Sequence, residues 1–181
     1  MKFQATPLQG AFVVELEPHA DERGFFARTF CEREFAAHGL PTRFPQSNLS
    51  RNARARTLRG MHFQAEPYFE AKLVRAVSGA IYDVIVDLRR TSPTFLHWFG
   101  VELSGESARA LFVPERFAHG FLTLQDHTDV FYQMGEFFRP EGARGLRWND
   151  ASLGIRWPGA PEVIAERDAH YDDFDPEAFD G

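Results

Sequence analysis

A strand–turn–strand pattern in the middle of the chain constrains the fold more than any other feature. Two arms rich in β-branched and apolar residues, Lys72–Val77 and Ala80–Leu88, are separated only by a Ser-Gly pair. This spacing predicts a β-hairpin. In the second arm apolar side chains alternate onto one face of the strand, and Asp83 and Asp87 fall on the other. We therefore expect two paired antiparallel strands at the centre of the fold.

Further strand-like segments extend this pattern over most of the chain. Short apolar runs at 95–103, 110–113 and 129–134 are separated by turn residues, which is typical of a β-sandwich or barrel. The sequence also contains 19 phenylalanines, and aromatic residues fit the pleated, half-buried surface of a sheet. One short helix is expected within Cys31–His38, because Gly39 follows as a stop signal. The predicted class is all-β with a few short helices.

The chain is expected to form one domain over residues 1–181. This length is enough to bury a sizeable core, and no linker-like segment divides it. The segment beyond Pro140 is rich in glycine, proline and tryptophan, and we expect it to wrap the outside of the sheets. The acidic tail, 172–181, is expected to be disordered.

Composition argues against several classes of protein. A net charge of -6 argues against a broad nucleic-acid footprint. No apolar run is long enough to span a membrane, and the N-terminus lacks the apolar core of a signal peptide. Cys31 is the single cysteine, so no disulfide can form within the chain, and a cytoplasmic location is expected. P-loop, nucleophile-elbow and dinucleotide-binding signatures are also absent from the sequence.

Five side chains are the candidates for chemistry: His62, Lys72, His119, Tyr132 and Asp168. A single histidine in a β protein is more often structural than catalytic. The five residues together favour a functional site more strongly than any one of them does alone. In the predicted hairpin Lys72 shares a face with apolar residues, and a buried lysine is costly unless it has a partner or a task. A histidine and a lysine near each other could act as a general base and as the stabiliser of a negative oxygen.

A metal site is an alternative for the same residues. Jelly-roll proteins of the cupin type often bind a metal through two histidines one residue apart, a carboxylate and a distant histidine. Here Gln64 occupies the position of the second histidine, which leaves His62, Glu70 and His119 as possible ligands. Glutamine is a poor transition-metal ligand, and the cationic Lys72 would repel a metal ion. We therefore expect no metal.

Two arginine-containing segments each have two interpretations. Around Asp21–Gly24 the chain could form a simple turn followed by a strand, or Arg23 and Arg28 could bind an anion. The polar run 43–58, which carries several arginines, could be a solvated face or could line a phosphate site. Guanidinium groups match phosphate oxygens bidentately, so the sequence leaves both choices open.

Several longer motifs occur in order along the chain. They are Arg23-Gly24-Phe25-Phe26, Leu58-Arg59-Gly60-Met61-His62-Phe63-Gln64, Lys72-Leu73-Val74-Arg75, Tyr82–Arg89, Ser92-Pro93-Thr94-Phe95, Phe117-Ala118-His119-Gly120-Phe121, Tyr132, Trp148-Asn149-Asp150 and Glu166-Arg167-Asp168-Ala169. With these motifs the chain, from about Phe12 to Asp168, resembles the dTDP-4-dehydrorhamnose 3,5-epimerases, which are sugar-nucleotide isomerases of deoxysugar synthesis. The resemblance implies a cupin-type jelly-roll barrel and a reaction that needs no cofactor.

The resemblance assigns catalytic roles to four side chains. His62 would be the base, oriented by Asp168, while Lys72 would stabilise an enolate. Tyr132 would be the acid on the opposite face of the sugar. The chemistry is reasonable, because a ketone at C4 acidifies the protons at C3 and C5, and a neutral histidine can remove them. The substrate would be a nucleotide-linked 4-keto-6-deoxyhexose that is inverted at C3, C5 or both.

The resemblance also implies a set of substrate-binding residues. Arg59 and Arg23 would contact the diphosphate, and Gln46, Asn48 and His119 would contact the sugar or a phosphate. The full expected set is Arg23, Phe26, Arg28, Gln46, Asn48, Arg59, His119, Phe138 and Arg167. Family members are homodimers in which the N-terminal strands cross to the partner. In that case Arg23, Phe26 and Arg28 would belong to the neighbour's site.

The chain departs from the family pattern mainly at the nucleoside end. Arg28 stands where the family usually has a glutamate that accepts a hydrogen bond from thymine, and Phe138 stands where a tyrosine stacks on the base. Ala143 replaces a substrate-contacting glutamate. Smaller departures are Gln46-Ser47-Asn48 for Gln-Asp-Asn and Glu70-Ala71-Lys72 for Gln-Gly-Lys. Because arginine cannot accept a hydrogen bond, a CDP- or GDP-linked sugar is the alternative to the default dTDP sugar. A metal-dependent cupin enzyme and a non-catalytic sugar-nucleotide-binding cupin are further alternatives.

Overall fold

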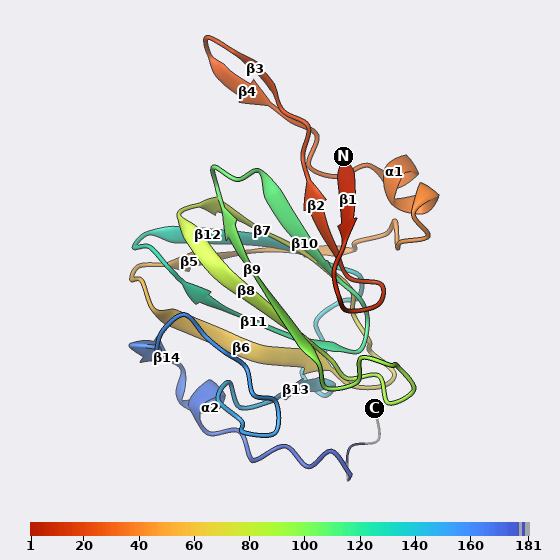
Figure 1. Ribbon diagram of the computed structural model, residues 1–181, viewed down its shortest axis with the longest axis vertical. Helices are drawn as coiled ribbons and strands as arrows, with labels where there is room; N and C mark the ends of the chain where they lie inside the picture. Colours follow the sequence, from red (N-terminus) through yellow and green to blue (C-terminus); the bar gives the residue numbers. More distant parts are fainter. Residues whose placement is uncertain (178, 180–181) are drawn as a thin grey trace.

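The computed structural model describes residues 1–177 and 179, and these form two main β-sheets (Figure 1). The first sheet has six strands in the spatial order β1 (Lys2–Ala5), β2 (Phe12–Glu15), β10 (Arg109–Val113), β7 (Lys72–Ser78), β12 (Thr128–Met134) and β5 (Gln46–Asn52). The second has the order β13 (Ala143–Gly145), β6 (Thr57–Gln64), β11 (Phe117–Thr123), β8 (Ala80–Asp87) and β9 (Trp98–Ser104), and β14 (Val163–Ile164) pairs parallel with β6. The predicted all-β class is confirmed.

The main hydrophobic core lies between the two sheets. Val74 and Val130 contribute to it from the first sheet, and Ile81 and Ile85 contribute from the second, all fully buried. Alternate side chains of a strand point to opposite faces, so each sheet turns one apolar row inward. Burial of each such side chain stabilises the fold by about 1.5–3 kcal/mol. This core holds the two sheets together at one end and leaves room for a cavity at the other.

Two further apolar clusters cover the outer faces of the sheets. Helix α1 (Glu32–Ala37) places the fully buried Phe35 against the outer face of the first sheet, which confirms the predicted short helix. The segment after Pro140 packs Leu153 and Phe174 against the outer face of the second sheet, as predicted. The tail expected to be disordered includes residues 178, 180 and 181, which lie outside the described residues.

The predicted hairpin of the central segment is wrong in its pairing, although both strands exist. Strand β7 pairs with β10 and β12 in the first sheet, whereas β8 pairs with β11 and β9 in the second. At Gly79, which has a positive φ of 67°, the chain passes from one sheet to the other. Both strands carry an apolar inner face, and stacking these faces buries more apolar surface than placing the strands edge to edge. The segment is therefore a corner of the two-sheet sandwich.

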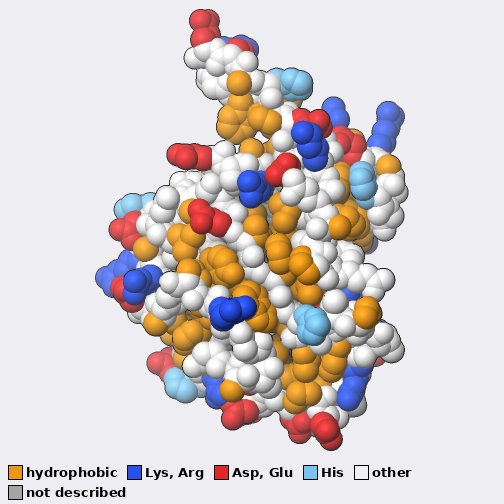
Figure 2. Space-filling model, viewed as in Figure 1, with side chains coloured by type: hydrophobic (Ala, Val, Ile, Leu, Met, Phe, Trp, Pro, Cys, Tyr) orange, Lys and Arg blue, Asp and Glu red, His pale blue; other side chains and the backbone are white. Residues whose placement is uncertain are grey.

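A two-stranded hairpin of β3 (His19–Asp21) and β4 (Gly24–Phe26) projects from the body of the molecule (Figure 1). The predicted turn and following strand are confirmed. Phe25 and Phe26 are 57% and 74% exposed, which is unusual for large apolar side chains. Figure 2 shows hydrophobic side chains around the base of this projection. In the chain as described, the hairpin packs little of its apolar surface.

One strand of the first sheet has no clear counterpart in the sequence pattern. Strand β5 lies within the polar run 43–58 and forms the edge of the sheet beside β12. It lacks an apolar row because one face borders the cavity and the other faces outward. The strand expected over 95–103 begins later, at Trp98, because residues 92–97 form tight turns. Among the described residues, no helix is long and apolar enough to cross a membrane.

Candidate active site

A cavity of about 600 Å³ opens between the two sheets, at the end where β5, β6, β7 and β12 approach one another. It is large enough for a small organic ligand. The predicted site residues that line it are Gln46, Asn48, Arg59, His62, Lys72, His119, Tyr132, Phe138, Arg167 and Asp168. All four predicted catalytic side chains therefore lie in one cavity, although they are as many as 106 positions apart in the chain.

A bulge in β6 places Arg59 and His62 on the same side of the sheet. His62 is paired with His119, but Arg59 is paired with Phe121, so the register shifts between them. In a regular strand two residues three positions apart would face opposite sides, and the extra residue of a bulge corrects this. The bulge contains Gly60, whose φ is 131°. A Cβ atom at Gly60 would lie 2.5 Å from the Cα of Gly120, so no larger residue fits.

His62 forms a hydrogen bond with Asp168, which comes from helix α2 (Glu166–Ala169) beside β6. The distance from Nε2 of His62 to Oδ1 of Asp168 is 2.8 Å, and Oδ2 of Asp168 accepts from the backbone N–H of Gly60 at 3.1 Å. Burial alone would raise the pKa of Asp168. The hydrogen bonds from His62, Gly60 and Arg167 outweigh it and hold that pKa below its ordinary value. Asp168 is thus an ionised, fixed partner of the histidine.

This contact determines which nitrogen of His62 is free. A carboxylate only accepts hydrogen bonds, so Nε2 carries the proton that it donates to Asp168. The other ring nitrogen, Nδ1, then has its lone pair available. Arg167 approaches the same pair, with Nε 3.3 Å from Oδ1 of Asp168 and Nη2 3.2 Å from Nε2 of His62. Because that nitrogen already donates to the closer Asp168, the approach of Nη2 is a contact and not a hydrogen bond. The His62 side chain is 34% exposed and that of Asp168 only 4%, so the histidine faces the cavity and its partner is shielded.

Lys72 and Glu70 form a buried ion pair at the start of β7. The distance from Nζ of Lys72 to Oε1 of Glu70 is 2.7 Å, and both side chains are less than a tenth exposed. Nζ also donates to the backbone oxygen of His62 at 3.4 Å. Lys72 is therefore held close to the histidine, as its predicted role requires. Oε2 of Glu70 is buried without a hydrogen-bond partner among the described residues.

Tyr132 lies on β12 in the first sheet, whereas His62 lies on β6 in the second. The two side chains therefore approach the cavity from opposite walls. Burial is the main cause of a raised pKa at Tyr132, and the negative charge of Glu70 adds to it. The phenol consequently keeps its proton through the neutral range and can act as an acid.

A second histidine–aspartate pair lies next to the first. His119 and Asp83 are on neighbouring strands, and Nε2 of His119 is 2.7 Å from Oδ1 of Asp83. Asp83 is fully buried, and its Oδ2 has no partner among the described residues. His119 reaches the cavity with its ring held by this carboxylate. Asp83 was not predicted as a site residue. The signal that could have identified it is a carboxylate between the apolar Ile81 and Ile85 on the inward face of β8.

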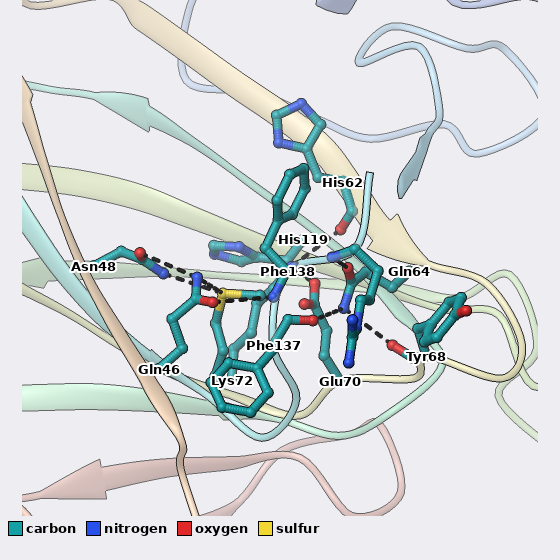
Figure 3. Close-up of polar contacts among 12 residues, drawn as sticks. Gln46, Asn48, His62, Gln64, Tyr68, Glu70, Lys72, His119, Phe137 and Phe138 are labelled. Carbon is teal, nitrogen blue, oxygen red and sulfur yellow. Dashed lines mark hydrogen bonds and ion pairs between the residues drawn. The ribbon is translucent and has the colours of Figure 1, made fainter. Parts of the chain in front are cut away.

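The outer part of the cavity is lined by amide and aromatic side chains (Figure 3). Gln46 and Asn48 approach from β5, and each donates to the sulfur of Met134, at 3.4 and 3.1 Å. Oε1 of Gln46 accepts from the backbone N–H of Phe138 at 3.0 Å. The ring of Phe138 is 51% exposed at the rim, where it could stack on a flat ligand.

Three predicted binding residues do not reach this cavity within the chain. Arg23 forms an ion pair with Asp21 inside the projecting hairpin. Arg28 pairs with Glu34 at 3.0 Å, and Phe26 is exposed. Among the described residues, no group of three histidine, cysteine or acidic side chains is arranged to hold a metal ion. Residues that line the cavity but were not predicted to bind substrate include Glu70, Arg144 and Tyr171.

Known proteins resemble this chain over nearly its whole length. The sequence model of a family described as dTDP-4-dehydrorhamnose 3,5-epimerase matches residues 5–175. A protein of that name from Methanothermobacter thermautotrophicus is 48% identical over 94% of this chain and 92% of its own. The crystal structure of the Bacillus anthracis epimerase with TDP and pyrophosphate bound has a TM-score of 0.89 and 41% identity, covering 93% of this chain and 96% of its own.

A third relative has a bound sugar nucleotide. The crystal structure of the 3,5-epimerase from Legionella pneumophila in complex with dTDP-4-keto-L-rhamnose has a TM-score of 0.88 and 36% identity. It covers 93% of this chain and 89% of its own. The fold expected from the resemblance, a cupin-like jelly roll, is confirmed by these neighbours. With a family match over residues 5–175 and a 48% identical relative that aligns over more than nine-tenths of both chains, the chain belongs to the dTDP-4-dehydrorhamnose 3,5-epimerase family.

Proposed function

We propose that this chain inverts C3 and C5 of a dTDP-linked 4-keto-6-deoxyhexose by removing and returning protons. The observation that carries the proposal is the placement of His62 and Tyr132 on opposite walls of one cavity, with Lys72 beside the histidine. Inversion of a carbon needs a base on one face of the sugar ring and an acid on the other. The cavity has both.

The geometry suggests how the reaction proceeds. Nδ1 of His62 removes the proton next to the C4 ketone, and Asp168 stabilises the imidazolium that forms. The negative charge that develops on the C4 oxygen lies near the buried ammonium group of Lys72. The phenol of Tyr132 then delivers a proton from the opposite wall. Each step uses only side chains of this chain.

The proposal includes a homodimer in which the β3–β4 hairpin completes the partner's site. The exposed Phe25 and Phe26 on the projecting hairpin support an exchange of this kind. It would bring Arg23, Phe26 and Arg28 to the substrate of the other subunit. Light scattering of the purified protein should give twice the mass of the 20.7 kDa chain. We also place the protein in the cytoplasm, in line with its single cysteine.

The nucleotide is proposed to be dTDP, as in the Legionella complex. Arg28 and Phe138 replace family residues at the base, so the choice can be tested directly. The dissociation constants of dTDP, CDP and GDP should be compared by calorimetry, and dTDP should bind most tightly. Tighter binding of CDP or GDP would instead assign the same chemistry to a different nucleotide sugar.

The reaction itself is tested by isotope exchange. The purified protein is incubated in deuterated water with dTDP-4-keto-6-deoxyglucose, and the sugar is followed by NMR. Deuterium should enter at C3 and C5, and none should enter with His62→Ala. Absence of incorporation with the dTDP, CDP and GDP sugars alike would defeat the proposal. Incorporation at one carbon only would restrict it to a single epimerisation.

A further inference from the structure

Glu70 is a buried carboxylate in the cavity to which the proposed mechanism gives no task. Its side chain is only 6% exposed, and it lines the cavity just before β7. Oε1 accepts a hydrogen bond from Lys72, but Oε2 has no partner among the described residues. A buried carboxylate oxygen without a partner is costly, so a donor from a bound ligand is the natural complement.

The surroundings of Glu70 show where this donor would lie. Figure 3 shows Glu70 beside Lys72, with which it forms the ion pair, and both side chains line the cavity together with His119. The charge of Glu70 also acts on Tyr132, where it adds to the effect of burial on the pKa of the phenol. Glu70 thus lines the same cavity as Lys72 and Tyr132, where the sugar ring would lie. Its Oε2 has almost no accessible surface in this conformation, so the carboxylate must rotate for a ligand to reach it.

The chemistry of the substrate identifies the donor. Two carbons flank the C4 ketone of a 4-keto-6-deoxyhexose. C3 carries a hydroxyl group, whereas C5 carries a methyl group and the ring oxygen, so C3 alone offers a donor beside C4. If Lys72 binds the C4 oxygen, the carboxylate that holds Lys72 is in position to bind the neighbouring hydroxyl.

We propose that Glu70 is a specificity-determining residue whose free carboxylate oxygen accepts a hydrogen bond from the C3 hydroxyl of the sugar. This inference rests on the proposed function, which places the C4 oxygen at Lys72. The ion pair then recognises two adjacent groups at once. The ammonium group of Lys72 donates a hydrogen bond to the C4 oxygen, and the carboxylate of Glu70 accepts one from the C3 hydroxyl. C3 is also one of the two carbons to be inverted, so Glu70 acts on the group whose orientation changes.

A cycle of two substrates and two enzymes separates this role from a purely structural one. The substrates are dTDP-4-keto-6-deoxyglucose and its 3-deoxy analogue, which still has an exchangeable proton at C5. The enzymes are the wild type and Glu70→Ala, and deuterium entry at C5 is measured by NMR as a function of substrate concentration. Glu70→Gln, which nearly keeps the shape, is a second variant in case the alanine variant folds poorly. Glu141→Gln removes an exposed carboxylate outside the cavity and serves as the matched control.

The proposal predicts an effect that depends on the hydroxyl. A hydrogen bond to a charged acceptor corresponds to a change of at least about tenfold in binding. Loss of the ion pair to Lys72 affects both substrates alike. Glu70→Ala should therefore raise KM about tenfold more for the parent sugar than for the 3-deoxy analogue. The glutamine variant should show the same pattern with a smaller ratio, because a neutral amide is a weaker acceptor. Glu141→Gln should match the wild type.

Other results would overturn the inference. An equal rise in KM for both substrates, or a fall in kcat alone, would show that Glu70 only positions Lys72. Equal KM values of the wild type for the two substrates would also contradict it, whatever the variants do. If the wild type puts no deuterium into either substrate, the proposed function itself fails. The two failures are therefore distinguishable.

Discussion

The two histidine–aspartate pairs are similar in geometry and differ in their surroundings. His62 and His119 are direct cross-strand partners on β6 and β11. Each has Nε2 within 2.8 Å of a buried carboxylate, Asp168 in one pair and Asp83 in the other. The His62 side chain is 34% exposed, whereas that of His119 is 9% exposed. One ring is open to a ligand over a third of its surface, and the other is nearly enclosed.

The two carboxylates differ as well. Asp168 also accepts hydrogen bonds from the Gly60 N–H and from Arg167, so it has partners even without its histidine. Asp83 has a single described partner, His119, and one oxygen without any. The comparison teaches that a histidine–aspartate pair does not identify a base by itself. The more exposed pair, His62–Asp168, is called the open pair and is suited to moving protons. The buried pair, His119–Asp83, is called the closed pair and is suited to holding the imidazole ring in place.

Replacement of His62 by asparagine should have the largest effect on activity. Removal of the base should lower kcat by about a thousandfold or more, which corresponds to about 4 kcal/mol in the barrier. Stability should change little, because Asp168 keeps its other partners. Deuterium exchange and thermal unfolding measure the two quantities. Activity within tenfold of the wild type would show that the open pair does not supply the base.

The corresponding replacement of His119 should act mainly on stability. His119→Asn leaves Asp83 as a fully buried charge that has lost its described partner, which costs about 3 kcal/mol or more. The double variant His119→Asn/Asp83→Asn should regain part of this loss, because the buried charge is gone. Denaturant unfolding at pH 7 gives the free energies. A single variant as stable as the wild type would contradict the assignment of the closed pair to structure.

Tyr132→Phe should separate removal of the proton from inversion. Without the acid on the opposite wall, His62 can still remove a proton and return a solvent-derived one to the same face. Formation of the epimer should fall about a hundredfold, while deuterium should enter the unchanged sugar at a measurable rate. NMR of the sugar distinguishes the two outcomes. Equal losses of exchange and of inversion would show that the tyrosine is also needed for the first step.

The sequence predicted the all-β class and indicated side chains that the structure brings into one cavity, but it did not predict how the strands pair. His62, Lys72 and Asp168 were predicted because each belongs to a motif that is recognisable without knowledge of the chain path, and the structure brings all three together with Tyr132 in one cavity. The placement of Arg59 beside His62 depends on the bulge at Gly60, which a strand pattern does not reveal. The role of Asp83 was missed for a similar reason, since it depends on the pairing of β8 with β11.

The wrong hairpin shows where local patterns stop being informative. Two apolar strands joined by Ser-Gly fit a hairpin and a corner between stacked sheets equally well, because both bury the same alternating rows. The choice is made by distant strands: β10 and β12 occupy the edges of β7, and β9 and β11 occupy those of β8. The polar strand β5 was missed because an edge strand beside a cavity needs no apolar row.

The smallest predicted effect concerns the pH dependence that Asp168 gives to stability. Its hydrogen bonds keep its pKa in the folded protein below the ordinary value of 3.8. Stability from this group is therefore fully present above the ordinary value and is lost as the pH falls through the folded pKa. Asp168→Asn should cost about 1 kcal/mol at pH 7, and the difference from the wild type should shrink below about pH 4. Urea unfolding of both proteins at pH 7, 5, 4 and 3 measures this difference in the free energy of unfolding. A difference that stays constant across this range would mean that the variant loses packing or geometry and not the ionised pair. In that case the contrast between the two histidine–aspartate pairs would rest on the exposure of their histidines alone.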